Sequence, residues 1–110
     1  MAVGLFGKLE KNTHASPKEC VLVFLHAAPL PDEFWTLQDK LYEVMDNSNV
    51  GEFDGNEIGK GTATLFFYGP DANQLFRGVE PILKGYPMCR NARVVLRKGG
   101  PGSRQTEFQL

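Results

Sequence analysis

Residues 20–25 form an unbroken run of apolar side chains, Cys-Val-Leu-Val-Phe-Leu. A strand with one face in water alternates apolar and polar residues, whereas an unbroken run is typical of a strand that is covered on both faces. The run therefore predicts an interior strand, around which the other elements have to be arranged. With 110 residues, of which 42 % are hydrophobic and 23 % charged, the chain has the size and composition of one globular domain.

Two segments have the periodicity of amphipathic helices, with apolar residues recurring every three or four positions. These residues are Phe34, Leu37, Leu41, Val44 and Met45 in the first segment, and Ala72, Leu75, Phe76, Val79, Ile82 and Leu83 in the second. The first helix is predicted to begin near Asp32, a suitable N-terminal capping residue, and to end at residues 47–49. The second is predicted to begin at residues 69–71, with Pro70 in its first turn, and to end before Gly85.

Four other segments are rich in β-branched, aromatic or alternating residues and predict strands. They cover residues 50–54, 62–68, 92–97 and 105–110, and glycine-rich turns are predicted over 55–61 and 99–102. The order is strand, helix, strand, strand, helix, strand, with an additional C-terminal strand. It predicts an α+β fold, the ferredoxin-like split βαβ sandwich (βαββαβ), with two helices on one face of an antiparallel sheet. We expect residues 1–17 to form a flexible N-terminal arm and residues 18–110 a single α+β domain.

The net charge of −1 conceals two segments of opposite charge. Residues 32–57 hold eight acids and one lysine, whereas residues 77–104 hold seven bases and one acid. Three of the acids recur at helical spacing, so one face of the first predicted helix is acidic. Like charges at neighbouring helical positions repel each other, and a basic binding partner would relieve that repulsion. The candidate interaction residues are Asp39, Glu43, Asp46, Glu52, Asp54, Arg77, Arg93 and Arg97.

The predicted topology is shared with RNA-recognition domains, whose third strand carries aromatic residues that stack on bases. In the corresponding segment, residues 60–67, Thr62 and Thr64 stand where two of these aromatic residues would be. Stacking contributes about 1–3 kcal/mol per base, so its loss argues against nucleic acid as the partner. Weak RNA binding by the basic C-terminal third is kept as a second alternative.

Sequence motifs of enzymes and metal sites are incomplete. Residues 54–57, Asp-Gly-Asn-Glu, look like the start of a calcium loop, but Ile58 and Leu65 occupy two of the ligand positions. Cys20 and His26 share a predicted strand but lie about 20 Å apart along it, and spacing ties no nucleophile to His26. We therefore predict no catalytic residue, no metal site and no cofactor, which favours a protein that is not an enzyme.

The chain has three distinctive features: residues 54–57, residues 68–72 (Tyr-Gly-Pro-Asp-Ala), and an Arg-rich closing strand with a Gly-Pro-Gly turn. With them, the stretch from Glu52 to Leu83 resembles small, functionally uncharacterised bacterial proteins. The resemblance implies a bacterial cytosolic protein with the ferredoxin-like βαββαβ fold. It carries no catalytic residue.

The charge pattern and the missing motifs lead to a functional hypothesis. We expect a small cytoplasmic protein-interaction module that binds a protein partner or its own copy through the acidic helix face and the basic C-terminal strand region. One form is an inhibitor or immunity-type protein whose acidic helix covers a basic site on a toxin. The alternative is a small anionic-ligand-binding domain or enzyme that uses Arg77, Arg93 and Arg97. The longest apolar run is far shorter than the roughly 20 residues of a membrane span, so we expect no membrane insertion.

Overall fold

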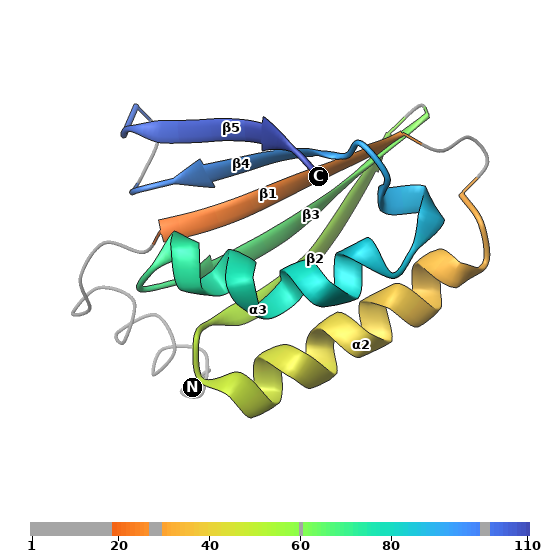
Figure 1. The fold of residues 1–110 in the computed structure, drawn as a ribbon, viewed down its shortest axis with the longest axis horizontal. Helices are drawn as coiled ribbons and strands as arrows, with labels where there is room; N and C mark the ends of the chain where they lie inside the picture. The colour runs from red at the N-terminus through yellow and green to blue at the C-terminus, as the bar shows by residue number, and fades with distance from the viewer. Residues whose placement is uncertain (1–18, 27–29, 60, 100–101) are drawn as a thin grey trace, which may run out of the picture.

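The computed structural model describes residues 19–26, 30–59, 61–99 and 102–110. The arm predicted over residues 1–17 lies outside the described residues. Along the chain, the elements in Figure 1 are β1 (Glu19–His26), α2 (Glu33–Ser48), β2 (Glu52–Gly59), β3 (Thr62–Gly69), α3 (Ala72–Lys84), the 3₁₀ helix η1 (Pro87–Cys89), β4 (Arg93–Arg97) and β5 (Gln105–Gln109).

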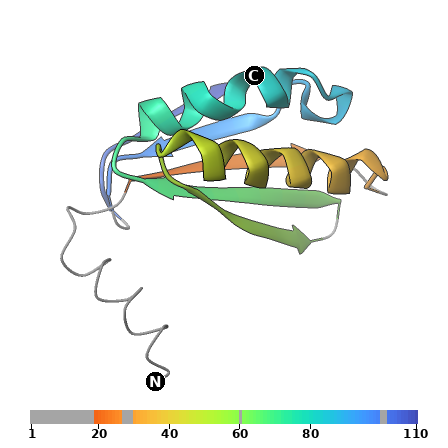
Figure 2. The ribbon, with the colours of Figure 1, turned by 90° about the horizontal axis from the view of Figure 1, so that it is seen from below.

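The strands form one antiparallel sheet in the order β2-β3-β1-β4-β5. The helices α2 and α3 lie side by side on one face of this sheet (Figures 1 and 2). This arrangement confirms the predicted ferredoxin-like α+β fold, and β5 is the predicted additional strand, paired with β4. The strand with the unbroken apolar run, β1, occupies the interior position between β3 and β4.

Alternate residues of the strands face the helices and form the main core. On β3 the alternation is complete, because Ala63, Leu65 and Phe67 are buried while Thr64 and Phe66 are partly exposed on the other face. The helices cover this core with the apolar residues that the periodicity predicts. The fully buried ones are Phe34, Leu37, Leu41, Ala72, Leu75, Val79 and Leu83. Each buried leucine or phenylalanine contributes about 1.5–3 kcal/mol to the stability of the fold.

The strand β1 is buried on both faces. Val21, Val23 and Leu25 point toward the helices, and Cys20 and Leu22 are buried on the opposite face. The prediction of an interior strand is therefore confirmed. On the face opposite the helices, the cover comes from side chains of neighbouring strands.

The start of α3 is fixed by two carboxylates. Asp71 is the N-cap, and its side chain accepts hydrogen bonds from the backbone N–H groups of Asn73 at 2.9 Å and Gln74 at 3.3 Å. Glu19 of β1 accepts a third hydrogen bond, from the backbone N–H of Ala72, at 2.7 Å. These contacts satisfy N–H groups that have no partner inside the helix. Pro70 precedes the cap, so its predicted place in the first turn was wrong.

The strand β2 begins and ends later than the predicted strand over residues 50–54. A β-bulge between Phe53 and Gly55 lets the strand continue, and Gly55 has a φ of 101°, which a residue without a side chain adopts at low steric cost. Beyond the bulge, the Nδ2 of Asn56 donates a hydrogen bond of 2.6 Å to the Oε1 of the buried Gln38 on α2. This hydrogen bond ties β2 to the helix layer.

Two backbone segments lie very close together at the start of β2 and the end of β3. A Cβ atom added at Gly69 would collide with the carbonyl oxygen of Val50 and would lie 3.1 Å from the Cα of Gly51. The backbone atoms cannot move aside as a flexible side chain could. Gly78, in the middle of α3, differs because its added Cβ would lie 3.6 Å from side chains of Met45 and Val50, an ordinary contact distance.

We therefore predict opposite effects for two glycine substitutions. Gly69→Ala should lower the free energy of unfolding by about 1–3 kcal/mol, because it overpacks a backbone crossing. Gly78→Ala should raise it by about 0.5–1 kcal/mol, because alanine favours the helix over the unfolded chain. Urea unfolding followed by far-ultraviolet circular dichroism measures both changes. Equal effects of the two substitutions would contradict the packing described for Gly69.

Candidate functional site

The sheet face opposite the helices carries a cluster of apolar side chains. Its centre is buried, and three aromatic rings that remain partly exposed pack around this centre. We refer to these residues as the open-face cluster: Cys20, Leu22, Phe24, Phe66, Tyr68 and Val95. They come from the three interior strands β1, β3 and β4, which are neighbours in the sheet.

Charged residues border the open-face cluster on two sides. Residues that pair across an antiparallel sheet point to the same face, so the register places these charges. It aligns Glu52, Tyr68, Cys20 and Arg97 in one row across the strands, and Glu57, Thr64, Phe24 and Arg93 in another. Acids therefore lie on β2 and arginines on β4, separated by three strand spacings, or about 14 Å.

The two arginines of β4 make different contacts. Arg93 forms an ion pair with Glu107 of β5 at 3.0 Å, and its guanidinium carbon lies 4.1 Å from the ring centroid of Phe24. Arg97 pairs with Cys20 across the strands, and its charge offsets part of the rise that burial causes in the pKa values of Cys20 and Tyr68. Each guanidinium group thus borders the open-face cluster, where an arginine can contact apolar and acidic groups together.

The hydroxyl and thiol groups in the open-face cluster are uncharged at neutral pH. Burial raises the pKa of Tyr68, and the nearby Cys20 and Asp54 raise it further against the effect of Arg97. Burial also raises the pKa of Cys20. Asp54 lies at the bulge of β2, between Phe53 and Gly55, and is exposed; it is near enough to Tyr68 for its charge to act on that hydroxyl. The centre of the face is therefore neutral, with the acids of β2 on one side and the arginines of β4 on the other, where Arg93 is already paired with Glu107.

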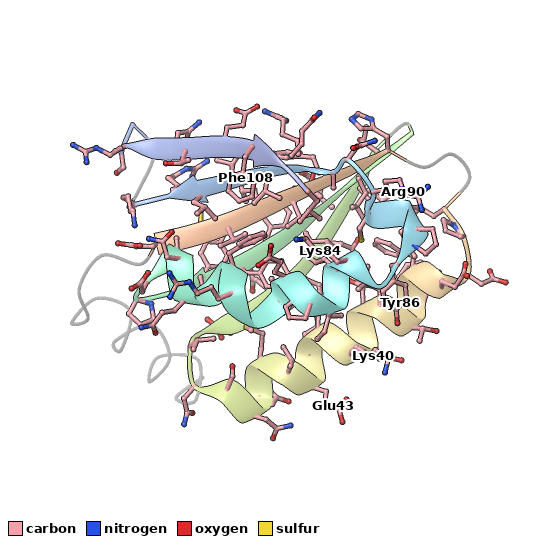
Figure 3. All side chains as sticks on the ribbon, viewed as in Figure 1. Lys40, Glu43, Lys84, Tyr86, Arg90 and Phe108 are labelled. Atoms are coloured by element: carbon pink, nitrogen blue, oxygen red, sulfur yellow. The ribbon has the colours of Figure 1, made fainter. Side chains whose placement is uncertain are left out.

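A second candidate surface lies on α2. At 3.6 residues per turn, Trp35, Asp39, Tyr42 and Asp46 follow one side of the helix, and we refer to these four residues as the α2 stripe. All four are exposed, with 52 % of Trp35 and 46 % of Tyr42 accessible to solvent. Glu43 borders the stripe and projects from α2 away from the sheet (Figure 3). The predicted acidic helix face thus exists and includes two exposed aromatic rings.

Sequence reasoning missed Trp35 and Tyr42. Both rings lie outside the apolar periodicity of the helix, and this position is the signal that could have found them. Each is held by another ring: Trp35 meets Phe34 at 4.9 Å between centroids, and Tyr42 meets Phe53 of β2 at 4.6 Å. Each of the two rings therefore packs against a buried phenylalanine on one side and is accessible to solvent on the other.

The three arginines proposed for an anionic-ligand site do not come together. Arg77 is exposed on α3, in the helix layer. Arg93 and Arg97 belong to the opposite face of the sheet, as the register shows. Likewise, the acids Asp39, Glu43 and Asp46 lie on α2, whereas Glu52 and Asp54 lie on β2.

A cleft of about 350 Å³ lies where the end of α3 meets η1 and the end of β5, a region in which Figure 3 labels Lys84, Tyr86 and Arg90. It is lined by Lys84, Gly85, Tyr86, Pro87, Cys89, Arg90 and Leu110. Lys84 forms an ion pair with Glu80 at 3.0 Å. Burial raises the pKa of Cys89 to about 11, so this thiol is protonated at neutral pH and is not a ready nucleophile. No motif in the sequence marked this cleft.

Within the described part of the chain, no three His, Cys, Asp or Glu side chains are grouped so that they could hold a metal ion. Neither of the described helices α2 and α3 has the length and apolar character needed to cross a membrane. In comparisons with protein-family models, curated proteins and solved structures, no match to this chain was found.

The raised pKa of Cys89 predicts a loss of stability in alkaline solution. The unfolded thiol loses its proton near pH 9 and the folded one near pH 11, so the unfolded state is favoured as the pH rises between these values. This one group should lower the free energy of unfolding by about 2 kcal/mol over that range. Urea unfolding from pH 8 to pH 11 measures the decrease.

The Cys89→Ala variant is the control for this prediction. It should show a smaller decrease with pH, and part of the decrease should remain because the pKa values of Cys20 and Tyr68 are also raised. If the variant and the parent chain lose stability equally between pH 9 and pH 11, burial of Cys89 does not control this effect.

Proposed function

We propose that this chain is a non-enzymatic interaction module that binds a basic protein surface through the α2 stripe. The observation that carries the proposal is the exposure of Trp35 and Tyr42 beside Asp39 and Asp46. Tryptophan, tyrosine and arginine dominate the binding energy of protein interfaces. An exposed pair of aromatic rings next to carboxylates is therefore a surface that fits arginine-rich partners.

The chemistry of the α2 stripe favours arginine over lysine. A guanidinium group can stack on an aromatic ring and donate two hydrogen bonds to one carboxylate, whereas an ammonium group is a compact point charge. The carboxylates of Asp39 and Asp46 lie on the same side of α2 as the two rings, so one partner segment can use both contacts. Glu43 adds negative charge at the border of the stripe.

We place the protein in the bacterial cytoplasm, in agreement with the resemblance of residues 54–57 and 68–72 to small bacterial proteins. In one form of this function, the α2 stripe covers a basic active or nucleic-acid-binding site of another protein and inhibits it. Such inhibition needs no catalytic group in the inhibitor, because occupancy of the basic site is enough.

Trp35 provides a direct test, because it is the only tryptophan in the chain. Titration with nona-arginine should shift the emission of Trp35 to shorter wavelength, as the partner removes water from the ring. Nona-lysine should bind more weakly, nona-glutamate should cause no shift, and added salt should weaken the binding. If no basic peptide changes the emission, the proposed function is wrong.

Two double variants with equal net charge separate a specific surface from general attraction. Asp39→Asn/Asp46→Asn removes two negative charges from the α2 stripe and should weaken nona-arginine binding by about threefold to tenfold. Gln105→Lys/Gln109→Lys changes the net charge equally on β5 and should have a smaller effect. Isothermal titration calorimetry measures both affinities. Equal weakening would show that net charge, and not the stripe, attracts the peptide.

A further inference from the structure

The open face of the sheet is self-complementary in charge. Acids on β2 lie on one side of the open-face cluster, and arginines on β4 lie on the other. Phe24, Phe66 and Tyr68 lie between them and keep part of their ring surfaces accessible. Aromatic rings at the centre and charged residues at the rim are the usual composition of a protein interface.

A two-fold axis parallel to the strands would use this charge distribution. If the axis runs above the boundary between β3 and β1, it places β2 of one copy over β4 of the other. Glu52 would then lie opposite Arg97 of the second copy and Glu57 opposite Arg93, with Asp54 two residues from Glu52 on β2, and the same contacts would form twice. The aromatic rings of both copies would meet along the axis, with the two sheets packed as in an aligned sandwich.

The other face-to-face arrangement is unfavourable. A two-fold axis in the plane of the interface but perpendicular to the strands places β2 over β2 and β4 over β4. Acids would then face acids and arginines would face arginines, which costs free energy at an interface. The charge pattern therefore selects one of the two symmetric arrangements.

We propose that a second copy of this chain covers the open face, related to the first by a two-fold axis parallel to the strands. The occupant is a protein surface and not nucleic acid, because the acids of β2 would repel phosphate groups. Thr62 and Thr64 also face outward on β3, where RNA-recognition domains place stacking rings. The inference does not require the α2 stripe, which lies in the helix layer.

The area of the face sets the expected strength of the dimer. Four strands at about 4.8 Å spacing, with up to eight residues each, present on the order of 500 Å² per copy. The total of about 1,000 Å² lies below the roughly 1,200–2,000 Å² of stable specific interfaces and in the range of weak, transient ones. We therefore expect a reversible dimer whose dissociation constant is in the micromolar range. The dimer would be populated only in concentrated solutions.

Sedimentation equilibrium of the full chain over a range of concentrations tests the dimer, and charge swaps test the axis. Arg97→Glu and Asp54→Lys should each weaken self-association by about tenfold, because each places like charges opposite each other at both symmetric contacts. An equimolar mixture of the two variants should associate again, since opposite charges face each other at both contacts of the mixed dimer.

Matched controls lie on the helix side of the sheet. Arg77→Glu and Asp39→Lys make the same changes in net charge on α3 and α2, and both should leave self-association unchanged. Circular dichroism of every variant shows whether it is folded. A folded wild-type chain that stays monomeric at all concentrations overturns the proposal, whether or not the chain binds basic peptides.

Two further results would also overturn it. If the wild-type chain dimerises but Arg97→Glu and Asp54→Lys dimerise equally well, the axis does not bring β2 over β4. If a fluorescein-labelled oligouridylate binds a monomeric wild-type chain and Arg97→Glu abolishes this binding, the face belongs to nucleic acid. Restored association in the mixture supports the proposed arrangement, because neither variant alone has opposite charges at both contacts.

Discussion

The pairing of β1 with β3 and β4 is the constraint on which the other elements depend. β1 is apolar on both faces, so it is stable only where helices cover one face and neighbouring side chains cover the other. Its neighbour β4 has one face toward the helices, with Val94 and Leu96, and one toward the open side, with Arg93 and Arg97. A shift of the register by one residue would turn the arginines toward the helices. One register therefore sets both the core and the charged margins of the open face.

The fold could be predicted because its main elements have strong periodic signals. The apolar spacing of α2 and α3 and the β-prone runs of β1 and β3 locate these elements within a few residues. β2 was predicted too short, because glycine and asparagine usually end a strand, and here Gly55 forms a bulge while Asn56 binds Gln38 of α2. That contact depends on residues far apart in sequence, which local patterns do not contain.

The candidate site was only partly predictable for the same physical reason. Charge counts identified the acidic and basic segments, but the register decides that Glu52 shares a face with Arg97 while Asp39 does not. The exposure of Trp35 and Tyr42 depends on how α2 is rotated over β2. Amphipathic periodicity shows which residues face the core, but it does not show which outward residues a neighbouring strand covers.

The two proposed surfaces influence each other through charge. In the monomer, the acids of β2 and those of the α2 stripe can both attract a basic partner. In the proposed dimer, Glu52 and Glu57 lie opposite arginines of the second copy, so much of their charge is neutralised. The acids of α2 remain, because both helix layers lie on the outside of a sandwich with two sheets at its centre. Dimer formation would therefore direct basic partners to the α2 stripes, and each dimer would present two of them on opposite sides.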